Sequence, residues 1–187
     1  MEGRTRQGPG ANALRREIEV RVVGQSRASA EQVFDVLADL RSHLSWAGER
    51  QKSTTRLLTL EAPEGPASVG TEFATTGVDP MGEFTDRSVV TEATRPSAFE
   101  FVTEARLLTK RGKVADWTNV HRYELTPSQG GCRITYTIRI ARVSSLPGPL
   151  ALFNVRVLSG VVRKASQGAP QRGLDNLAKA AEERIGV

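Results

Sequence analysis

The sequence predicts an α+β domain in which a curved antiparallel sheet of seven strands wraps around a long C-terminal helix. Three observations support this prediction. Apolar and polar residues alternate in successive strand-like segments, two short helical patterns follow the first of them, and apolar residues recur at helical spacing near the C-terminus. We expect the sheet and the helix to enclose an apolar pocket for a small ligand.

The length and composition indicate one domain. The chain has 187 residues, of which 39% are hydrophobic and 25% charged, as in ordinary globular proteins. We expect a flexible basic N-terminal tail over residues 1–15 and a single ligand-binding domain over 16–187. Four arginines and one glutamate in the first sixteen residues contribute +3 of the net charge of +5. A basic tail alone is a weak electrostatic footprint, so nucleic-acid binding is not expected.

Cysteine usage and hydropathy indicate a cytoplasmic protein. Cys132 is the only cysteine, which excludes an intrachain disulfide and a cysteine-based metal cluster. The N-terminus lacks the apolar stretch of a signal peptide, and no apolar run reaches 18 residues. We therefore expect neither export nor a membrane span.

The first elements are a strand and two short helices. Residues 17–23 alternate between polar and apolar side chains, which predicts a half-buried strand. Ser29 and Gln32 have the spacing of a capping box, which predicts that a helix begins here and covers residues 30–37. Asp39 is expected to cap a second, shorter helix.

Six further strands are expected in the middle of the chain. Proline, glycine and aspartate clusters separate segments with strand-like alternation. These segments are approximately 50–61, 69–77, 83–94, 97–106, 113–126 and 131–142.

The last part of the chain predicts a long helix. Apolar residues recur at helical spacing from about residue 150 to residue 181, and Phe153 and Val157 in its first part are expected to line the pocket. Gly168 and Pro170 predict a kink or break, because proline lacks an amide donor and clashes with the preceding turn.

Local motifs agree with this order of elements. They are residues 29–36 (SAEQVFDV), Trp46, Val69-Gly70-Thr71, Val90-Thr91-Glu92, Arg95-Pro96 and the segment 174–182. With these motifs, residues 17 to 185 resemble the START-like (SRPBCC) superfamily, which includes polyketide cyclase/dehydrase-like proteins and plant pathogenesis-related lipid binders. The resemblance implies a helix-grip fold. That superfamily also includes lipid carriers and hormone receptors, so the resemblance predicts architecture better than function.

Strand alternation selects the residues expected to face the pocket. In the helix-grip fold, the concave face of the sheet borders the ligand, and side chains two residues apart share a face. The apolar or aromatic faces of the last two strands are the predicted inner faces. They carry Ala115, Trp117, Asn119, His121, Tyr123 and Leu125 on one strand, and Cys132, Ile134, Tyr136, Ile138 and Ile140 on the other. Earlier strands are expected to add Phe99, Phe101 and Asp86, the last on a less clearly patterned strand.

His121 is the candidate catalytic residue. An imidazole on an apolar wall can act as a general base or donate a hydrogen bond to a substrate carbonyl. The alternative is a buried histidine that only satisfies neighbours such as Tyr123 or Asn119. Between these roles, we favour orientation of a ligand.

Three other side chains have competing interpretations. Asp86 would be costly to bury as a lone charge unless an arginine such as Arg87 or Arg106 paired with it, and otherwise it is exposed. Asn119 suits either a ligand carbonyl or hydroxyl or a contact at a strand end. Trp46 is expected in the core or at the pocket rim.

The sequence contains no motif for a metal or nucleotide cofactor. It has no glycine-rich phosphate loop, no HExxH and no nucleophile elbow, and its two histidines, His43 and His121, are too few for a histidine metal site. Cys132 is expected to be a buried, inert thiol. We predict no cofactor and no metal.

Three functions are compatible with the sequence. The first is binding or transport of a hydrophobic, lipid-like or polyketide-like small molecule. The second is a polyketide cyclase or dehydratase in which His121, Asn119 or Tyr123 orients carbonyls and exchanges protons. The third is a regulatory or scaffolding module that uses the basic tail.

Overall fold

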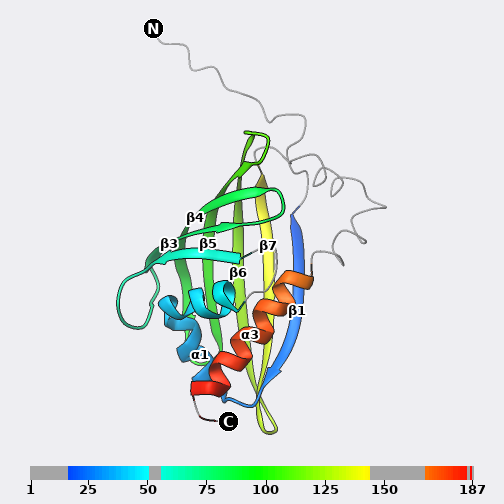
Figure 1. Cartoon of the computed structure of the whole chain (residues 1–187). Coiled ribbons are helices and arrows are strands. Elements are labelled where there is room, and N and C mark those ends of the chain that lie inside the picture. Colours follow the sequence, from blue (N-terminus) through cyan, green and yellow to red (C-terminus); the bar gives the residue numbers. More distant parts are fainter. Residues whose placement is uncertain (1–16, 51–55, 144–166, 185, 187) are drawn as a thin grey trace.

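The structure is a computed structural model that describes residues 17–50, 56–143, 167–184 and 186 (Figure 1). The predicted basic tail and the first part of the predicted C-terminal helix, with Phe153 and Val157, lie outside the described residues.

Within the described ranges, seven strands form one antiparallel sheet in the order β1-β7-β6-β5-β4-β3-β2. Their bounds are Ile18–Ser26 (β1), Arg56–Glu61 (β2), Glu72–Val78 (β3), Gly82–Thr94 (β4), Ala98–Thr109 (β5), Val114–Ser128 (β6) and Gly131–Val143 (β7). From β2 to β7, each strand pairs with the next one in the sequence. Strand β1 pairs with β7, so β1 and β2 are the two edge strands. The seven-stranded antiparallel sheet predicted from the alternation is confirmed.

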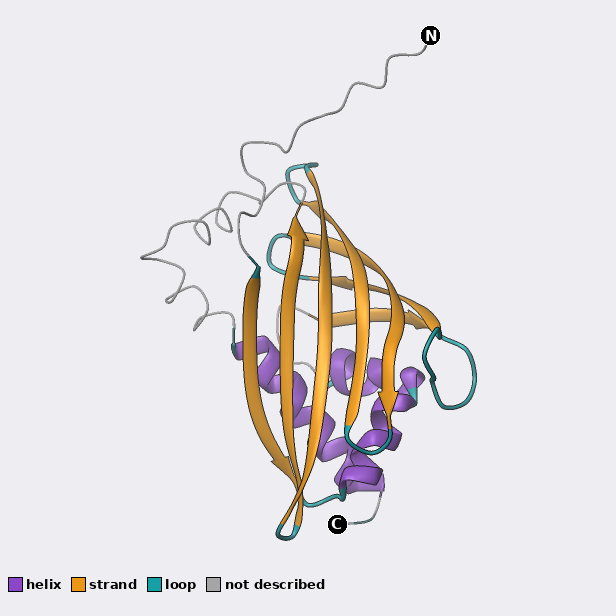
Figure 2. Ribbon diagram, turned by 180° about the vertical axis from the view of Figure 1, so that it is seen from behind, coloured by secondary structure: helices purple, strands orange, loops and turns teal. Residues whose placement is uncertain are grey.

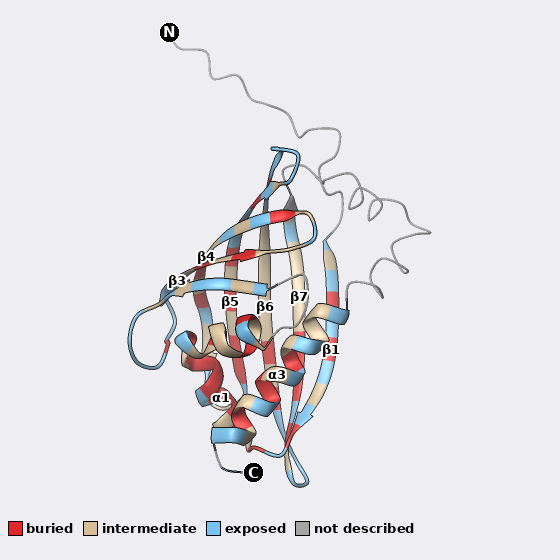
Figure 3. Ribbon diagram, in the orientation of Figure 1, coloured by how far each residue is buried: buried red, intermediate tan, exposed pale blue. Residues whose placement is uncertain are grey.

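The sheet is strongly curved, and its helices lie on one side of it. Seen from behind, the strands form a continuous wall, with the helices beyond it (Figure 2). The buried residues of α1 (Ala30–Ala38) and α3 (Gly168–Arg184), red in Figure 3, belong to one hydrophobic cluster with buried residues of the strands. The side that the helices cover is therefore the concave, inner face.

Helix α1 begins as the sequence predicts. The Ser29 amide donates to Gln32 Oε1 at 2.8 Å, and the Gln32 amide donates to Ser29 Oγ at 3.4 Å, which completes a capping box. The 3₁₀ turn η1 (Leu40–Ser42) and the π-helical turn η2 (Leu44–Glu49) follow. The predicted Asp39 cap is wrong: with φ −80° and ψ 82° its side chain makes no capping hydrogen bond. It pairs instead with Arg184 of α3.

Helix α3 crosses the concave face and is fixed along its C-terminal half (Figure 1). Ser26 Oγ donates to the Ala178 carbonyl at 3.2 Å, and Asn176 Nδ2 donates to the Trp46 carbonyl at 3.0 Å. Gly168 and Pro170 stand in the first turn of α3, where a missing amide donor costs little. The chain that precedes this turn lies outside the described residues, so the predicted kink is not tested.

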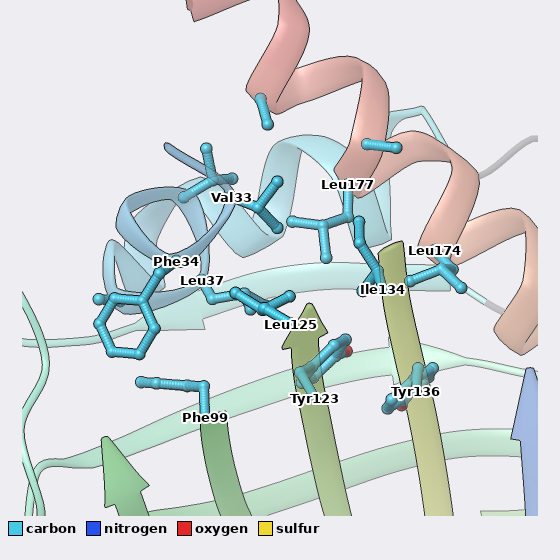
Figure 4. Close-up of a cluster of buried hydrophobic side chains, with 14 of the residues drawn as sticks. Val33, Phe34, Leu37, Phe99, Tyr123, Leu125, Ile134, Tyr136, Leu174 and Leu177 are labelled. Carbon is cyan, nitrogen blue, oxygen red and sulfur yellow. The ribbon is translucent and has the colours of Figure 1, made fainter. Parts of the chain in front are cut away.

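One end of the concave face is filled by apolar side chains, and we call it the packed end. Figure 4 shows side chains from α1, α3 and the strands meeting there. Its largest fully buried members include Leu37, Phe99, Ile134, Leu174 and Leu177. Phe34 of α1 meets Phe99 of β5 edge to face, with the ring centroids 5.9 Å apart. This packing holds both helices against the sheet.

Candidate functional site

Beyond the packed end, the concave face borders a cavity of about 310 Å³. Its wall consists mainly of rings and aliphatic side chains from the sheet, η2 and the first turns of α3. The rings belong to His43, Trp46, Phe73, Phe84, Phe101, His121, Tyr123 and Tyr136. A volume of this size is within the range of small-molecule sites.

Small residues of α3 keep the cavity open. Ala169, Pro170 and Gly173 line it, whereas Leu174 and Leu177 of the same helix fill the packed end. A Cβ atom added at Gly173 would meet no atom within 4 Å, so there is open space beside this position. The cavity exists because α3 changes from large to small side chains along its length.

A hydrogen bond to Tyr136 orients His121. Tyr123 and Tyr136 are stacked, with ring centroids 4.3 Å apart. The Tyr136 hydroxyl lies 2.7 Å from His121 Nδ1, and we assign the hydroxyl as the donor because a phenol is a stronger acid than a neutral imidazole. Because Nδ1 accepts, Nε2 carries the proton of the neutral ring. Nε2 has no hydrogen-bond partner among the described residues, so it is a free donor.

Both histidines of the cavity are neutral at physiological pH. Burial lowers the pKa of His121 to about 4, and nearby His43 lowers it further by a smaller amount. Burial also lowers the pKa of His43 to about 4, although its bond to the Leu37 carbonyl acts in the opposite direction. His121 is therefore suited to donate a hydrogen bond to a ligand from Nε2.

His43 is a cavity residue that sequence reasoning missed. From the sequence, His43 was considered only as a metal ligand. In the structure its side chain is buried, and Nε2 donates to the Leu37 carbonyl at 2.8 Å. Its ring lies 4.7 Å from that of Trp46. Trp46 itself lines the cavity while almost fully buried, as expected for a residue of the core or the rim. The signal was available, because His43 lies between Leu40 and Trp46 in an apolar helical pattern.

Asp86 lines the cavity, and no ion pair joins it to a cation among the described residues. Its carboxyl bonds Thr75, the residue opposite it on β3. Its Oδ1 is buried and has no hydrogen-bond partner among the described residues. Burial raises the pKa of Asp86 to about 7, with the Thr75 bond acting weakly in the opposite direction. Of the two arginines considered as partners, Arg106 is paired with Asp116, and no ion pair joins either of them to Asp86.

The predicted wall residues divide into three groups. Six of them border the cavity: Asp86, Phe101, His121, Tyr123, Tyr136 and Ile138. Phe99 lies in the packed end, because α1 covers that end of β5. Trp117 and Asn119 are half-buried on the same face of β6 as His121 but do not border the cavity.

A short polar row crosses the sheet near the cavity. Ser88 and Thr103 share a hydrogen bond of 2.9 Å between their hydroxyls, and both line the cavity. Asn119 stands opposite Thr103 on β6, and its buried Oδ1 has no hydrogen-bond partner in the described part of the chain. Polar groups are thus few and are placed at separate points of a mainly apolar wall.

A family model described as "Polyketide cyclase / dehydrase and lipid transport" matches residues 17–182. The chain belongs to this family. The match covers the seven described strands, α1 and most of α3, and so confirms the START-like resemblance noted in the sequence. None of the curated proteins compared with the sequence matches it.

Solved structures with low sequence identity share the fold of this family member. An uncharacterised protein from Rhizobium leguminosarum is 13% identical, with a TM-score of 0.63 over 92% of this chain and 97% of its own. TTHA0849 from Thermus thermophilus is 15% identical, with a TM-score of 0.60 over 89% and 98%. Ara h 8.0201 is 11% identical, with a TM-score of 0.55 over 90% and 99%. At such identities the likeness shows the helix-grip fold alone.

Three further features of the described residues bear on the site. No group of three or more His, Cys, Asp or Glu side chains in those ranges is arranged to hold a metal ion. Among the same residues, no helix is both long and apolar enough to cross a membrane. Cys132 is buried, and burial raises the pKa of its thiol, which keeps it protonated.

Proposed function

We propose that this protein binds a hydrophobic, lipid-like or polyketide-like small molecule in the cavity and acts as a carrier or receptor for it. The observation that supports the proposal is a cavity of about 310 Å³ whose wall is mainly aromatic and aliphatic. Transfer of an apolar ligand from water to such a wall is favourable in proportion to the area buried. The lipid-transport part of the family description agrees with this function.

His121 would orient the bound molecule. Its Nε2 proton is available because Tyr136 occupies Nδ1. A hydrogen-bond donor on a mainly apolar wall suits a ligand with a carbonyl or hydroxyl oxygen, which fixes the direction of binding. The stacked Phe101 ring, 4.7 Å from His121, holds the imidazole plane in place.

A cyclase or dehydratase of polyketide type is the second candidate. Asp86 favours it, because a carboxyl on the cavity wall with a pKa of about 7 can both accept and return a proton near neutral pH. His121 would polarise a substrate carbonyl. Replacing His121 with Ala would then abolish turnover but preserve the fold and ligand binding, and unchanged turnover would exclude His121 from the mechanism.

The cytoplasm is the compartment we propose for this protein. A single cysteine, buried and protonated, suits a reducing environment. The partner we propose is a small molecule.

A fluorescence titration with 1-aminoanthracene, a neutral apolar probe at pH 8, tests the binding function. We expect saturable binding of one probe per chain. Gly173→Leu should weaken it at least tenfold, because the new side chain enters the open space beside Gly173. Gly173→Ala is the matched control and should bind nearly as well as the unmodified protein.

Circular dichroism melts would show that both variants are folded. Equal affinity of the unmodified protein and Gly173→Leu would contradict binding in this cavity. Failure of the unmodified protein to bind the probe would also count against the proposed function.

A further inference from the structure

The carboxyl group of Asp86 is an unusual feature of the cavity wall. Buried acceptors in folded proteins nearly always have a hydrogen-bond donor, and a lone buried carboxylate is costly. Thr75 bonds the carboxyl, but Oδ1 is buried and has no partner in the described ranges. The side chain borders the cavity, so a rotation of the carboxyl group would present an unsatisfied oxygen to a bound molecule.

No protein cation neutralises this carboxyl in the described part of the chain. Arg87 points to the opposite, exposed face of β4, and Arg106 pairs with Asp116. Arg56 of β2 contributes to the cavity lining but is exposed, and no ion pair joins it to Asp86. Since no described residue supplies a cation to Asp86, the ligand is the source of the cation in the proposal below.

Aromatic rings flank the same position. Phe84 lies two residues before Asp86 on the same face of β4, and Phe73 lies two residues before Thr75 on β3. Ring faces attract ammonium groups, most strongly where water is excluded. A carboxyl group next to such rings has the chemistry of a site for an organic cation.

We propose that Asp86 binds the protonated amine of an apolar ligand and thereby selects amines over alcohols and carboxylic acids. This inference rests on the proposed binding function and deepens it by naming the headgroup. An ammonium donates to the carboxyl group and neutralises the carboxylate, whereas a ligand carboxylate is repelled by it. An alcohol gains the hydrogen bond without the charge.

His121 is placed to bind the other end of the same molecule. It pairs with Phe101 on β5, whereas Asp86 pairs with Ala105, four residues further along that strand. The two residues are separated by two inter-strand spacings across the sheet and by four residues along the strand direction. This places their Cα atoms roughly 15 Å apart. An elongated ligand with an amine at one end and a hydrogen-bond acceptor at the other matches both groups.

The charges around the cavity predict how this preference depends on pH. The groups that border the cavity with Asp86 are Arg56 of β2, His43 between η1 and η2, His121 and Tyr123 of β6, and Tyr136 of β7. The pKa of each histidine is lowered to about 4, and burial raises the pKa of both tyrosines. Among the described groups that border the cavity, Asp86 is therefore the one whose charge changes between pH 5 and pH 9. Amine affinity should rise from pH 6 to pH 8 as Asp86 ionises.

Three anthracene derivatives with one skeleton test the preference in the full-length protein. They are 9-(aminomethyl)anthracene, 9-anthracenemethanol and 9-anthracenecarboxylic acid, titrated by fluorescence at pH 8. We expect the amine to bind at least tenfold more tightly than the alcohol, and the acid to bind most weakly. Asp86→Asn should remove the advantage of the amine, while Glu83→Gln, on the exposed face of β4, should preserve it.

The outcomes separate this inference from the proposed function. If 1-aminoanthracene binds but the amine binds no tighter than the alcohol, or not at all, the amine preference is wrong and the binding function stands. An amine preference that survives Asp86→Asn would also overturn the role of Asp86. Loss of the preference in Asp86→Asn alone, with the alcohol affinity unchanged, supports it.

Discussion

The two ends of the concave face are built from the same strands and the same helix, yet they differ in what fills them. At the packed end, Leu174 and Leu177 of α3 belong to one buried cluster with Phe99 of β5 and Ile134 of β7, and all four are fully buried. At the cavity end, α3 presents Ala169, Pro170 and Gly173, and about 310 Å³ stays empty of protein atoms. The packed end and the cavity end differ because the side chains of α3 change from large to small along the helix.

Polarity changes at the same place as packing. Along the inner face of β6, Leu125 and Tyr123 are buried, and His121 is the first residue that offers a free hydrogen-bond donor. Along β4, buried Val90 is followed toward the cavity by Ser88 and then Asp86. Stability therefore comes mainly from the packed end, and recognition is expected at the cavity end.

The largest expected effect is a difference in stability between two variants, each with a phenylalanine replaced at one end of the concave face. Phe99→Ala should lower the free energy of unfolding by about 3–5 kcal/mol, because it leaves a void in close-packed surroundings. Phe84→Ala, at the half-buried cavity wall, should cost only about 1 kcal/mol, because its ring already borders empty space. Urea unfolding of both variants measures the difference. Equal losses would show that the two ends are packed alike.

Asp86→Asn should stabilise the protein in a pH-dependent way. The pKa of Asp86 is about 7 in the folded chain against an ordinary value of 3.8, so the unfolded chain gives up the proton more readily than the folded chain does. The penalty for burying the carboxylate is therefore absent below about pH 4 and complete above about pH 7. At pH 8 the variant should gain about 1–3 kcal/mol, discounted for partial exposure of the side chain.

Urea unfolding at pH 4 and pH 8 measures this gain, with Glu83→Gln as the exposed control on the same strand. A gain that is equal at both pH values would show that Asp86 is not buried as a carboxylate.

The smallest expected effects come from two glycines, one within α3 and one on β1 that faces it. Gly173→Ala should raise the free energy of unfolding by up to about 1 kcal/mol, because alanine favours the helix and its methyl group meets open space. Gly24→Ala on β1 should be destabilising, since its Cβ would lie 3.2 Å from Leu174 Cδ2 in the packed end. Thermal melts of both variants measure the signs. The same sign at both sites would contradict the difference in packing.

Local patterns in the sequence predicted the elements well. The period-two alternation of β6 and β7 predicted the inner faces that the structure shows at Tyr123 and Ile134, and Ser29 with Gln32 predicted the start of α1. These signals need only neighbouring residues. Asp39 was mispredicted because its partner, Arg184, is 145 residues away in the sequence.

The extent of the cavity could not be predicted from alternation. Trp117 and Asn119 share a face with His121, but the element that covers a strand decides which of its residues border empty space. That depends on where the small residues of α3 meet the sheet, which is a long-range property. His43 was missed because it enters the cavity from a helical turn and not from a strand.

The most direct test of ligand binding in the cavity is an isotope-filtered NMR experiment on ¹³C,¹⁵N-labelled protein with unlabelled 1-aminoanthracene. Occupation of the cavity predicts nuclear Overhauser contacts from the probe to the Ile138 methyl groups and the His121 ring, both of which line it. No contacts should reach Leu177 or Ile134 in the packed end. Saturable binding without contacts to Ile138 or His121 would contradict the central claim that this cavity is the ligand site.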